Sequence, residues 1–156
     1  MSCKTTCLVM LLGLVGAANP LYRSSAAMPV AAKGAQNSPS APQFISAEQL
    51  KAKLARNEAV TIIDVRDTES YLNSNKIKGS IYIKLRRLAY RLSMPPLKDI
   101  PRDRQVITYC ACPHDEASIR AAQIILDAGF KRVQVLQGGW QMWLKVNGQT
   151  DPRPRA

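Results

Sequence analysis

The chain of 156 residues lacks the marks of several protein classes. Aromatic residues make up only 6% of it and no known nucleic-acid motif occurs, so the net charge of +11 does not indicate a nucleic-acid partner. Its N-terminal apolar run, from Leu8 to Ala18, is about eleven residues and too short for a transmembrane helix. No internal repeat is present. The length suits one folded domain with tails.

Acidic residues are absent before Glu48, and the chain begins with the pattern of an export signal. Lys4 supplies a positive start, the apolar run follows, and small residues at 16–18 suit cleavage. We predict a signal peptide over residues 1–18, which would make the protein periplasmic or secreted. An uncleaved anchor and an organelle transit peptide are the alternatives.

Cysteine is also scarce. Cleavage would remove Cys3 and Cys7 and leave only Cys110 and Cys112, which are separated by one residue. Such a pair cannot join distant parts of a fold, so a framework of disulfides is excluded. Two neighbouring thiols in an exported chain favour a catalytic or redox use.

The rest of the chain divides by composition. Residues 19–43 are rich in Ala, Ser, Pro and Gln without periodic apolar positions, which predicts a flexible linker. The folded domain is expected over 44–148 and a disordered tail over 149–156. Within the domain, strand patterns alternate with helical patterns. The alternation predicts an α/β fold, a parallel sheet of about five strands with helices on both faces.

Two local signals support this layout. Ser46 and Gln49 have the spacing of a capping box at a helix start. Residues 84–92 place leucines on one helical face and Lys84, Arg87 and Arg91 on another. These three basic residues are either solvated surface, a means of steering anions, or a contact with an acidic membrane surface or protein.

The thiols lie where a strand meets a helix. A β-branched run ends in Cys110, at the carboxyl end of its predicted strand, where sites form in parallel sheets. A helix start can hold an anion and lower the pKa of a thiol. The alternative is that the cysteines are small buried residues at a turn. The loop and helix start that follow consist of Ala111, Cys112, Pro113, His114, Asp115, Glu116, Ala117 and Ser118.

The other polar residues of the loop have two interpretations each. His114 could assist proton transfer or be an exposed loop residue. Asp115 and Glu116 are expected to complement the dipole and cap of the helix, although carboxylates also oppose a nearby thiolate. Arg120 could reach back to the loop or be solvated. Three candidate ligands within five residues have poor geometry for a metal, so we expect none.

Several segments in a fixed order resemble the rhodanese-like (sulfurtransferase) domain, in a variant with a Cys-x-Cys-Pro loop. They are residues 63–66 with Glu69 and Tyr71, then 77–81, 106–110, 128–133, 136–139 and Trp143. The resemblance implies sulfane-sulfur transfer from a small anionic donor such as thiosulfate, through a cysteine persulfide, to a thiol or cyanide-like acceptor. It implies no cofactor. Asp64 and Arg66 are then buried structural partners near the loop.

The thiol loop departs from the family in two ways. Many active members have Cys, four residues, Arg or Lys, then Ser or Ala; counting back from Ser118 selects Cys112, whereas the strand end selects Cys110. We favour Cys110 as the nucleophile, which leaves Cys112 as a resolving thiol or the alternative nucleophile. The loop also has no Arg or Lys, so a thiol redox or binding module is the alternative function. A related phosphatase chemistry needs Cys, five residues and Arg, which neither cysteine offers.

Overall fold

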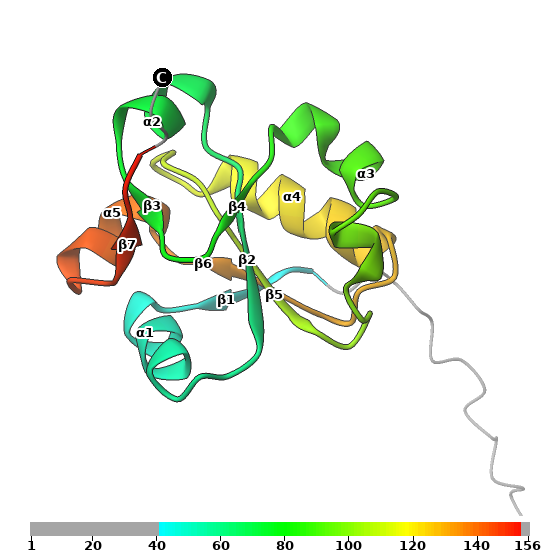
Figure 1. Ribbon diagram of the computed structural model, residues 1–156, viewed down its shortest axis with the longest axis horizontal. Coiled ribbons are helices and arrows are strands. Elements are labelled where there is room, and N and C mark those ends of the chain that lie inside the picture. Colours follow the sequence, from blue (N-terminus) through cyan, green and yellow to red (C-terminus); the bar gives the residue numbers. More distant parts are fainter. Residues whose placement is uncertain (1–40, 154–156) are drawn as a thin grey trace, which may run out of the picture. The chain divides into compact units, whose positions relative to one another are not determined.

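The computed structural model describes residues 41–153, so the predicted signal peptide and residues 19–40 of the predicted linker lie outside the described residues (Figure 1). None of the helices in this part of the chain combines the length and apolar character needed to cross a bilayer. The strands are β1 (Gln43–Ile45), β2 (Val60–Asp64), β3 (Lys76–Ile77), β4 (Ile81–Tyr82), β5 (Gln105–Tyr109), β6 (Arg132–Leu136) and β7 (Thr150–Asp151). The helices are α1 (Ala47–Ala55), α2 (Thr68–Asn73), α3 (Leu88–Arg91), α4 (Glu116–Asp127) and α5 (Gly139–Lys145), with 3-10 turns η1 (Leu85–Arg87) and η2 (Leu97–Asp99).

Five strands form a parallel sheet in the order β1-β6-β5-β2-β4, which confirms the predicted α/β fold. The central strand β5 is buried along its whole length, as expected for a β-branched run covered on both sides. β2 and β5 are in register, with Asp64 opposite Tyr109. Both strands therefore end level with each other, and Cys110 follows at the carboxyl edge of the sheet.

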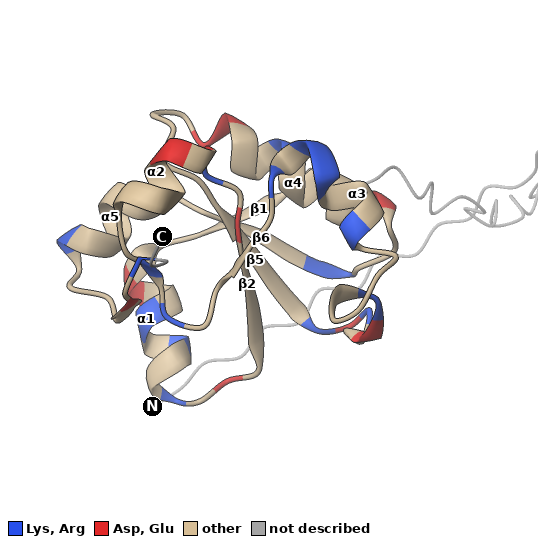
Figure 2. Ribbon diagram, turned by 45° about the horizontal axis from the view of Figure 1, so that its top comes forward, with Lys and Arg blue, Asp and Glu red and all other residues tan. Residues whose placement is uncertain are grey.

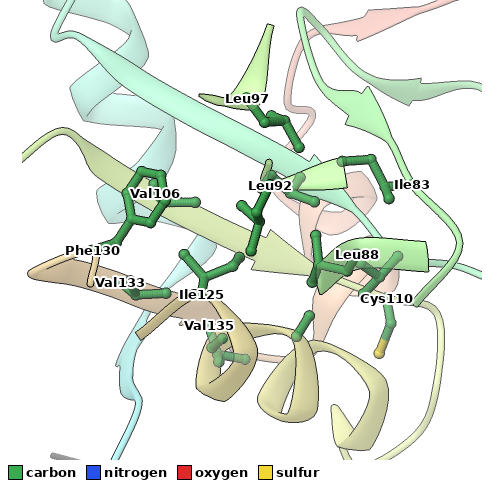
Figure 3. Close-up of a cluster of buried hydrophobic side chains, with 14 residues drawn as sticks. Ile83, Leu88, Leu92, Leu97, Val106, Cys110, Ile125, Phe130, Val133 and Val135 are labelled. Carbon is green, nitrogen blue, oxygen red and sulfur yellow. The ribbon is translucent and has the colours of Figure 1, made fainter. Parts of the chain in front are cut away.

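Helices cover both faces of this sheet. In Figure 1, α3 and α4 lie together beyond one face, and α1 and α5 lie together beyond the other. One buried cluster joins the first helix pair to the sheet, and Figure 3 shows Cys110 at its end beside Leu88. A second cluster, with Leu50, Trp140 and Trp143 among its members, joins the other pair. Burial of each large apolar side chain contributes about 1.5–3 kcal/mol, so the two clusters hold the strand ends rigidly in place.

The predicted cap of α1 is confirmed. The Ser46 hydroxyl accepts a hydrogen bond from the Gln49 N–H at 3.2 Å, and the Gln49 side chain accepts one from the Ser46 N–H at 2.9 Å. Two of the N–H groups that a helix start leaves free are thus satisfied.

The predicted helix over 84–92 is wrong in its continuity. The chain instead forms the turn η1 and the short helix α3, with Arg87 at φ −106° and ψ −2° between them. Leu85 and Leu88 are three residues apart, which matches the period of a 3-10 turn, and both contact the buried cluster. The chain thus changes conformation at Arg87, and α3 packs against α4.

The predicted disordered tail is wrong for residues 149–151. β7 pairs antiparallel with β3, the Gly79 N–H donates to Asp151 Oδ2 at 2.8 Å, and Trp143 Nε1 donates to the Gln149 carbonyl at 3.1 Å. Gln43, assigned to the linker, is likewise the first residue of β1. β7 is short and polar, so its pairing with β3 rather than its composition makes it a strand.

Candidate active site

A cleft of about 610 Å³ opens at the carboxyl edge of the sheet, between the ends of β2 and β5, the β4–η1 turn and the start of α4. Cys110 lies at its base with 1% of its surface exposed, and Cys112 is partly exposed. Its lining residues are Val65, Arg66, Asp67, Thr68, Tyr82, Lys84, Leu85, Arg86, Cys110, Ala111, Cys112 and Ala117.

The sulfur of Cys110 receives hydrogen bonds from two donors. The Cys112 N–H lies 3.4 Å from Cys110 Sγ, and the Ser118 hydroxyl lies 3.5 Å from it. The same hydroxyl donates to the Asp115 carbonyl at 2.9 Å, so its single hydrogen is shared between that carbonyl and Cys110 Sγ. Donors beside a helix start stabilise negative charge on a sulfur. The loop can therefore hold a thiolate or a persulfide anion.

Cys112 is a different kind of thiol. Burial, together with a hydrogen bond to the Cys110 side chain, raises the pKa of Cys112 to about 11. Its thiol is therefore protonated at neutral pH and can donate to Cys110. The choice of Cys110 over Cys112 as nucleophile stays a prediction, and this arrangement supports it.

Asp115 does not cap α4 through its side chain, contrary to the expectation. Its backbone is left-handed, at φ 57°, which turns the carboxylate away from the helix. Asp115 Oδ2 accepts a hydrogen bond from the Gly138 N–H at 2.8 Å, and Oδ1 has no partner among the described residues. Burial raises the pKa of this carboxyl group. Glu116 lies exposed in the first turn of α4, as its predicted dipole role requires.

The structure brings only part of the predicted loop into the cleft. Ala111, Cys112 and Ala117 line it, whereas Pro113 and Asp115 line a separate hollow on the other side of the loop. His114 and Arg120 are exposed. Their exposure agrees with the alternative interpretation of each, an exposed loop residue for His114 and a solvated side chain for Arg120.

Sequence reasoning missed several cleft residues. Lys84, Leu85 and Arg86 were assigned to a basic helix, and Tyr82 to a strand, without a place in the site. Their position directly after β4 was the available signal, because the carboxyl ends of parallel strands share one edge.

Asp64 and Arg66 are buried partners beside the loop. Their side chains are 0% exposed and form an ion pair at 2.8 Å. The Tyr109 hydroxyl donates to Asp64 Oδ2 at 2.7 Å, and Arg66 Nη1 donates to the Ser74 hydroxyl at 2.6 Å. The Arg66 guanidinium also lies over the Trp140 ring, 4.7 Å from its centroid. The network joins the ends of β2 and β5 to α2 and α5, so it fixes the floor of the cleft.

The turn between β6 and α5 supports the thiol loop from behind. The Trp140 N–H donates to the Cys110 carbonyl at 2.9 Å. Gly139 has φ +46°, and a Cβ there would lie 2.2 Å from that same carbonyl oxygen. Only glycine allows this close approach.

Replacing Gly139 with alanine is therefore expected to destabilise the fold by about 1–3 kcal/mol or more, because left-handed strain is joined by a backbone clash. Urea unfolding would measure the change. Gly79→Ala is the matched control, since Gly79 has φ +73° but no atom within 4 Å of its added Cβ. Equal losses of stability in the two variants would contradict the close approach of residue 139 to the Cys110 carbonyl.

The chain is similar to known proteins over most of its described part. The family model described as the rhodanese-like domain matches residues 46–146. The chain is 31% identical over 114 residues to the thiosulfate sulfurtransferase/rhodanese-like domain-containing protein 3 of Mus musculus, covering 67% of this chain and 70% of that protein. It is 29% identical over 105 residues to the thiosulfate sulfurtransferase GlpE of Shewanella oneidensis, covering 67% and 95%.

The chain is also similar to a solved structure. The Alr3790 protein of Anabaena sp. superposes with a TM-score of 0.60 at 32% identity, over 69% of this chain and 81% of that one. The family match includes the thiol loop and every strand of the sheet except β1. The chain therefore belongs to the rhodanese-like domain family, whose members include sulfurtransferases.

Proposed function

We propose that the protein is an exported sulfurtransferase that takes sulfane sulfur from a small anion such as thiosulfate, carries it as a persulfide on Cys110, and passes it to a thiol or cyanide-like acceptor. The paired hydrogen-bond donors on Cys110 Sγ, at the base of an open cleft, are the main support. The sulfurtransferase relatives support the reaction class. Export rests on the leader over residues 1–18 alone.

The reaction has two displacements. The Cys110 thiolate attacks the outer sulfur of thiosulfate, the S–S bond of thiosulfate breaks, and sulfite leaves with its electron pair. The new Cys110 persulfide anion remains among the loop donors. An acceptor thiolate or cyanide then attacks the outer sulfur and releases the Cys110 thiolate. No electron carrier or metal is needed to balance either step.

Cations for an anionic donor come from outside the loop. No Arg or Lys lies between Cys110 and Ser118, but Lys84 and Arg86 line the cleft. The Asp115 carboxylate binds the Gly138 N–H and does not line the cleft. Asp67 also lines the cleft, but its carboxylate accepts hydrogen bonds from the Ser70 N–H and hydroxyl at the start of α2. A sulfur anion would therefore meet Lys84 and Arg86 at the cleft wall, and these cations take the place of the Arg or Lys that the family loop carries.

The intact mass of the reduced protein after incubation with thiosulfate tests this proposal. A gain of one sulfur atom, removed by cyanide and absent in Cys110→Ser alone, is expected. Absence in Cys112→Ser alone would keep the function and move the nucleophile. No gain in the reduced wild-type protein would refute thiosulfate transfer.

A thiol redox or binding module is the second candidate, and the contact between the two thiols favours it. Here Cys110 and Cys112 would cycle between dithiol and disulfide with an external oxidant, without holding sulfur. Thiol trapping of freshly isolated protein decides between the candidates. A Cys110–Cys112 disulfide with no persulfide would support the redox module, and free or persulfidated thiols would count against it.

A further inference from the structure

The net positive charge of the described part of the chain comes from one segment. Residues 70–98 contain seven Lys and Arg and no Asp or Glu. The remaining described residues, 41–69 and 99–153, contain eleven of each and are neutral overall. A segregation of this kind creates a directed positive field, which a uniform spread of the same charge would not.

The basic residues that follow β4, up to the end of α3, form what we call the basic face: Lys84, Arg86, Arg87 and Arg91. Figure 2 shows Lys and Arg gathered on and beside α3, next to α4. Within residues 41–153, none of the four forms an ion pair. Arg86 and Arg87 are exposed, and Lys84 and Arg91 are half-buried. Their charges are therefore available to a partner.

The basic face extends beyond the cleft. Lys84 and Arg86 line the cleft wall, whereas Arg87 and Arg91 do not. Two large apolar side chains in and just after α3 are exposed, Tyr90 at 65% and Met94 at 40%. A small anion bound over Cys110 would leave Arg87, Arg91 and both apolar side chains unused.

We propose that the basic face, with Tyr90 and Met94, is the docking surface for an acidic protein that exchanges sulfur with Cys110 through a thiol of its own. The proposal rests on the proposed function and names the class of its partner. Negative side chains of the partner would pair with the free arginines, while an extended loop would bring its cysteine into the cleft. Tyr and Arg are the residue types that anchor protein interfaces.

The position of Cys110 favours a protein over a lipid surface. Cys110 is 1% exposed at the base of the cleft, so its partner atom must project from a surface to reach it. A membrane surface is flat on this scale and carries no thiol. An acidic protein supplies both the charge that the basic face needs and a sulfur that the cleft can admit.

Binding and transfer to synthetic peptides test the proposal. Three peptides of equal length carry one central cysteine flanked by Glu, Gln or Lys. Their binding is measured by fluorescence anisotropy with serine in place of the cysteine, so the readout does not need sulfur transfer. We expect the Glu peptide to bind at least tenfold more tightly than the Lys peptide, with the preference falling as salt rises. The rate of sulfur transfer from the Cys110 persulfide to the cysteine-containing peptides is expected to follow the same order.

Arg87→Glu/Arg91→Glu is the diagnostic variant, because neither residue lines the cleft. It should lose the preference for the Glu peptide while gaining sulfur from thiosulfate as before. Lys131→Glu/Lys145→Glu changes the net charge equally at exposed positions outside the basic face and should keep the preference. The proposal would be overturned if both double variants lost the preference for the Glu peptide equally, or if the wild-type protein showed no such preference.

Two further outcomes separate the alternatives. Failure to gain sulfur from thiosulfate, with peptide preference intact, would refute the proposed donor and keep the docking surface. Cosedimentation with anionic phospholipid vesicles that depends on Arg87 and Arg91, without a peptide preference, would overturn docking of a protein in favour of a membrane surface.

Discussion

Loss of sulfur from the Cys110 persulfide in the absence of an acceptor is expected to accelerate about tenfold per pH unit between pH 7 and 10, and to fall to background in Cys112→Ser. The reason is the neighbouring thiol. The pKa of Cys112 is raised to about 11, so its thiolate fraction rises about tenfold per unit below that pH. Only the thiolate attacks sulfur.

The step needs no reagent other than water. The Cys112 thiolate attacks Cys110 Sγ of the persulfide anion, the bond to the outer sulfur breaks, and that sulfur leaves with the electron pair and takes a proton from water to become hydrosulfide. A Cys110–Cys112 disulfide remains. At neutral pH the Cys112 thiol is almost entirely protonated, so the persulfide is expected to survive long enough to meet an acceptor.

Released hydrosulfide and intact mass, followed from pH 7 to 10, measure this prediction. Cys112→Ser gives the rate of hydrolysis and of loss to solvent. A pH profile that is identical in the wild type and Cys112→Ser would show that Cys112 does not reach the persulfide. Loss that is fast and independent of pH in the wild type alone would show a Cys112 thiolate already present at pH 7.

Replacing Arg66 with methionine is expected to destabilise the fold by about 3–5 kcal/mol, because Asp64 would remain buried without its counter-charge. The Tyr109 hydroxyl and the backbone N–H of residue 66 would still donate to Asp64, but two neutral donors do not replace a guanidinium. The cleft floor should loosen as well, since Arg66 also bonds Ser74 and lies over Trp140.

Urea unfolding measures the loss, as a lower midpoint at an unchanged slope. Arg56→Met is the matched control, because Arg56 pairs with Glu58 at the surface and its removal should change stability little. Adding Asp64→Asn to Arg66→Met should recover part of the stability by removing the unpaired charge. Equal effects of Arg66→Met and Arg56→Met would contradict a buried network.

Local pattern was sufficient for much of the architecture. The β-branched runs of β2 and β5 are unbroken, so burial on both faces followed from composition, and the Ser46–Gln49 cap followed from spacing. The break between η1 and α3 could not be predicted in this way. The leucine spacing over 84–92 fits an α-helix and a 3-10 turn equally well, and only packing in the folded protein distinguishes the two.

The α/β order, the buried central strand and the position of Cys110 at a strand end could be predicted, because they depend on residues close together in the chain. Which polar groups meet could not be predicted, because it depends on the tertiary structure. Asp115 binds Gly138, 23 residues away, and Lys84 and Arg86 line the cleft of Cys110 from the segment that follows β4. β7 exists because β3 offers it an edge. Such contacts depend on where the backbone brings distant segments together, which local periodicity does not specify.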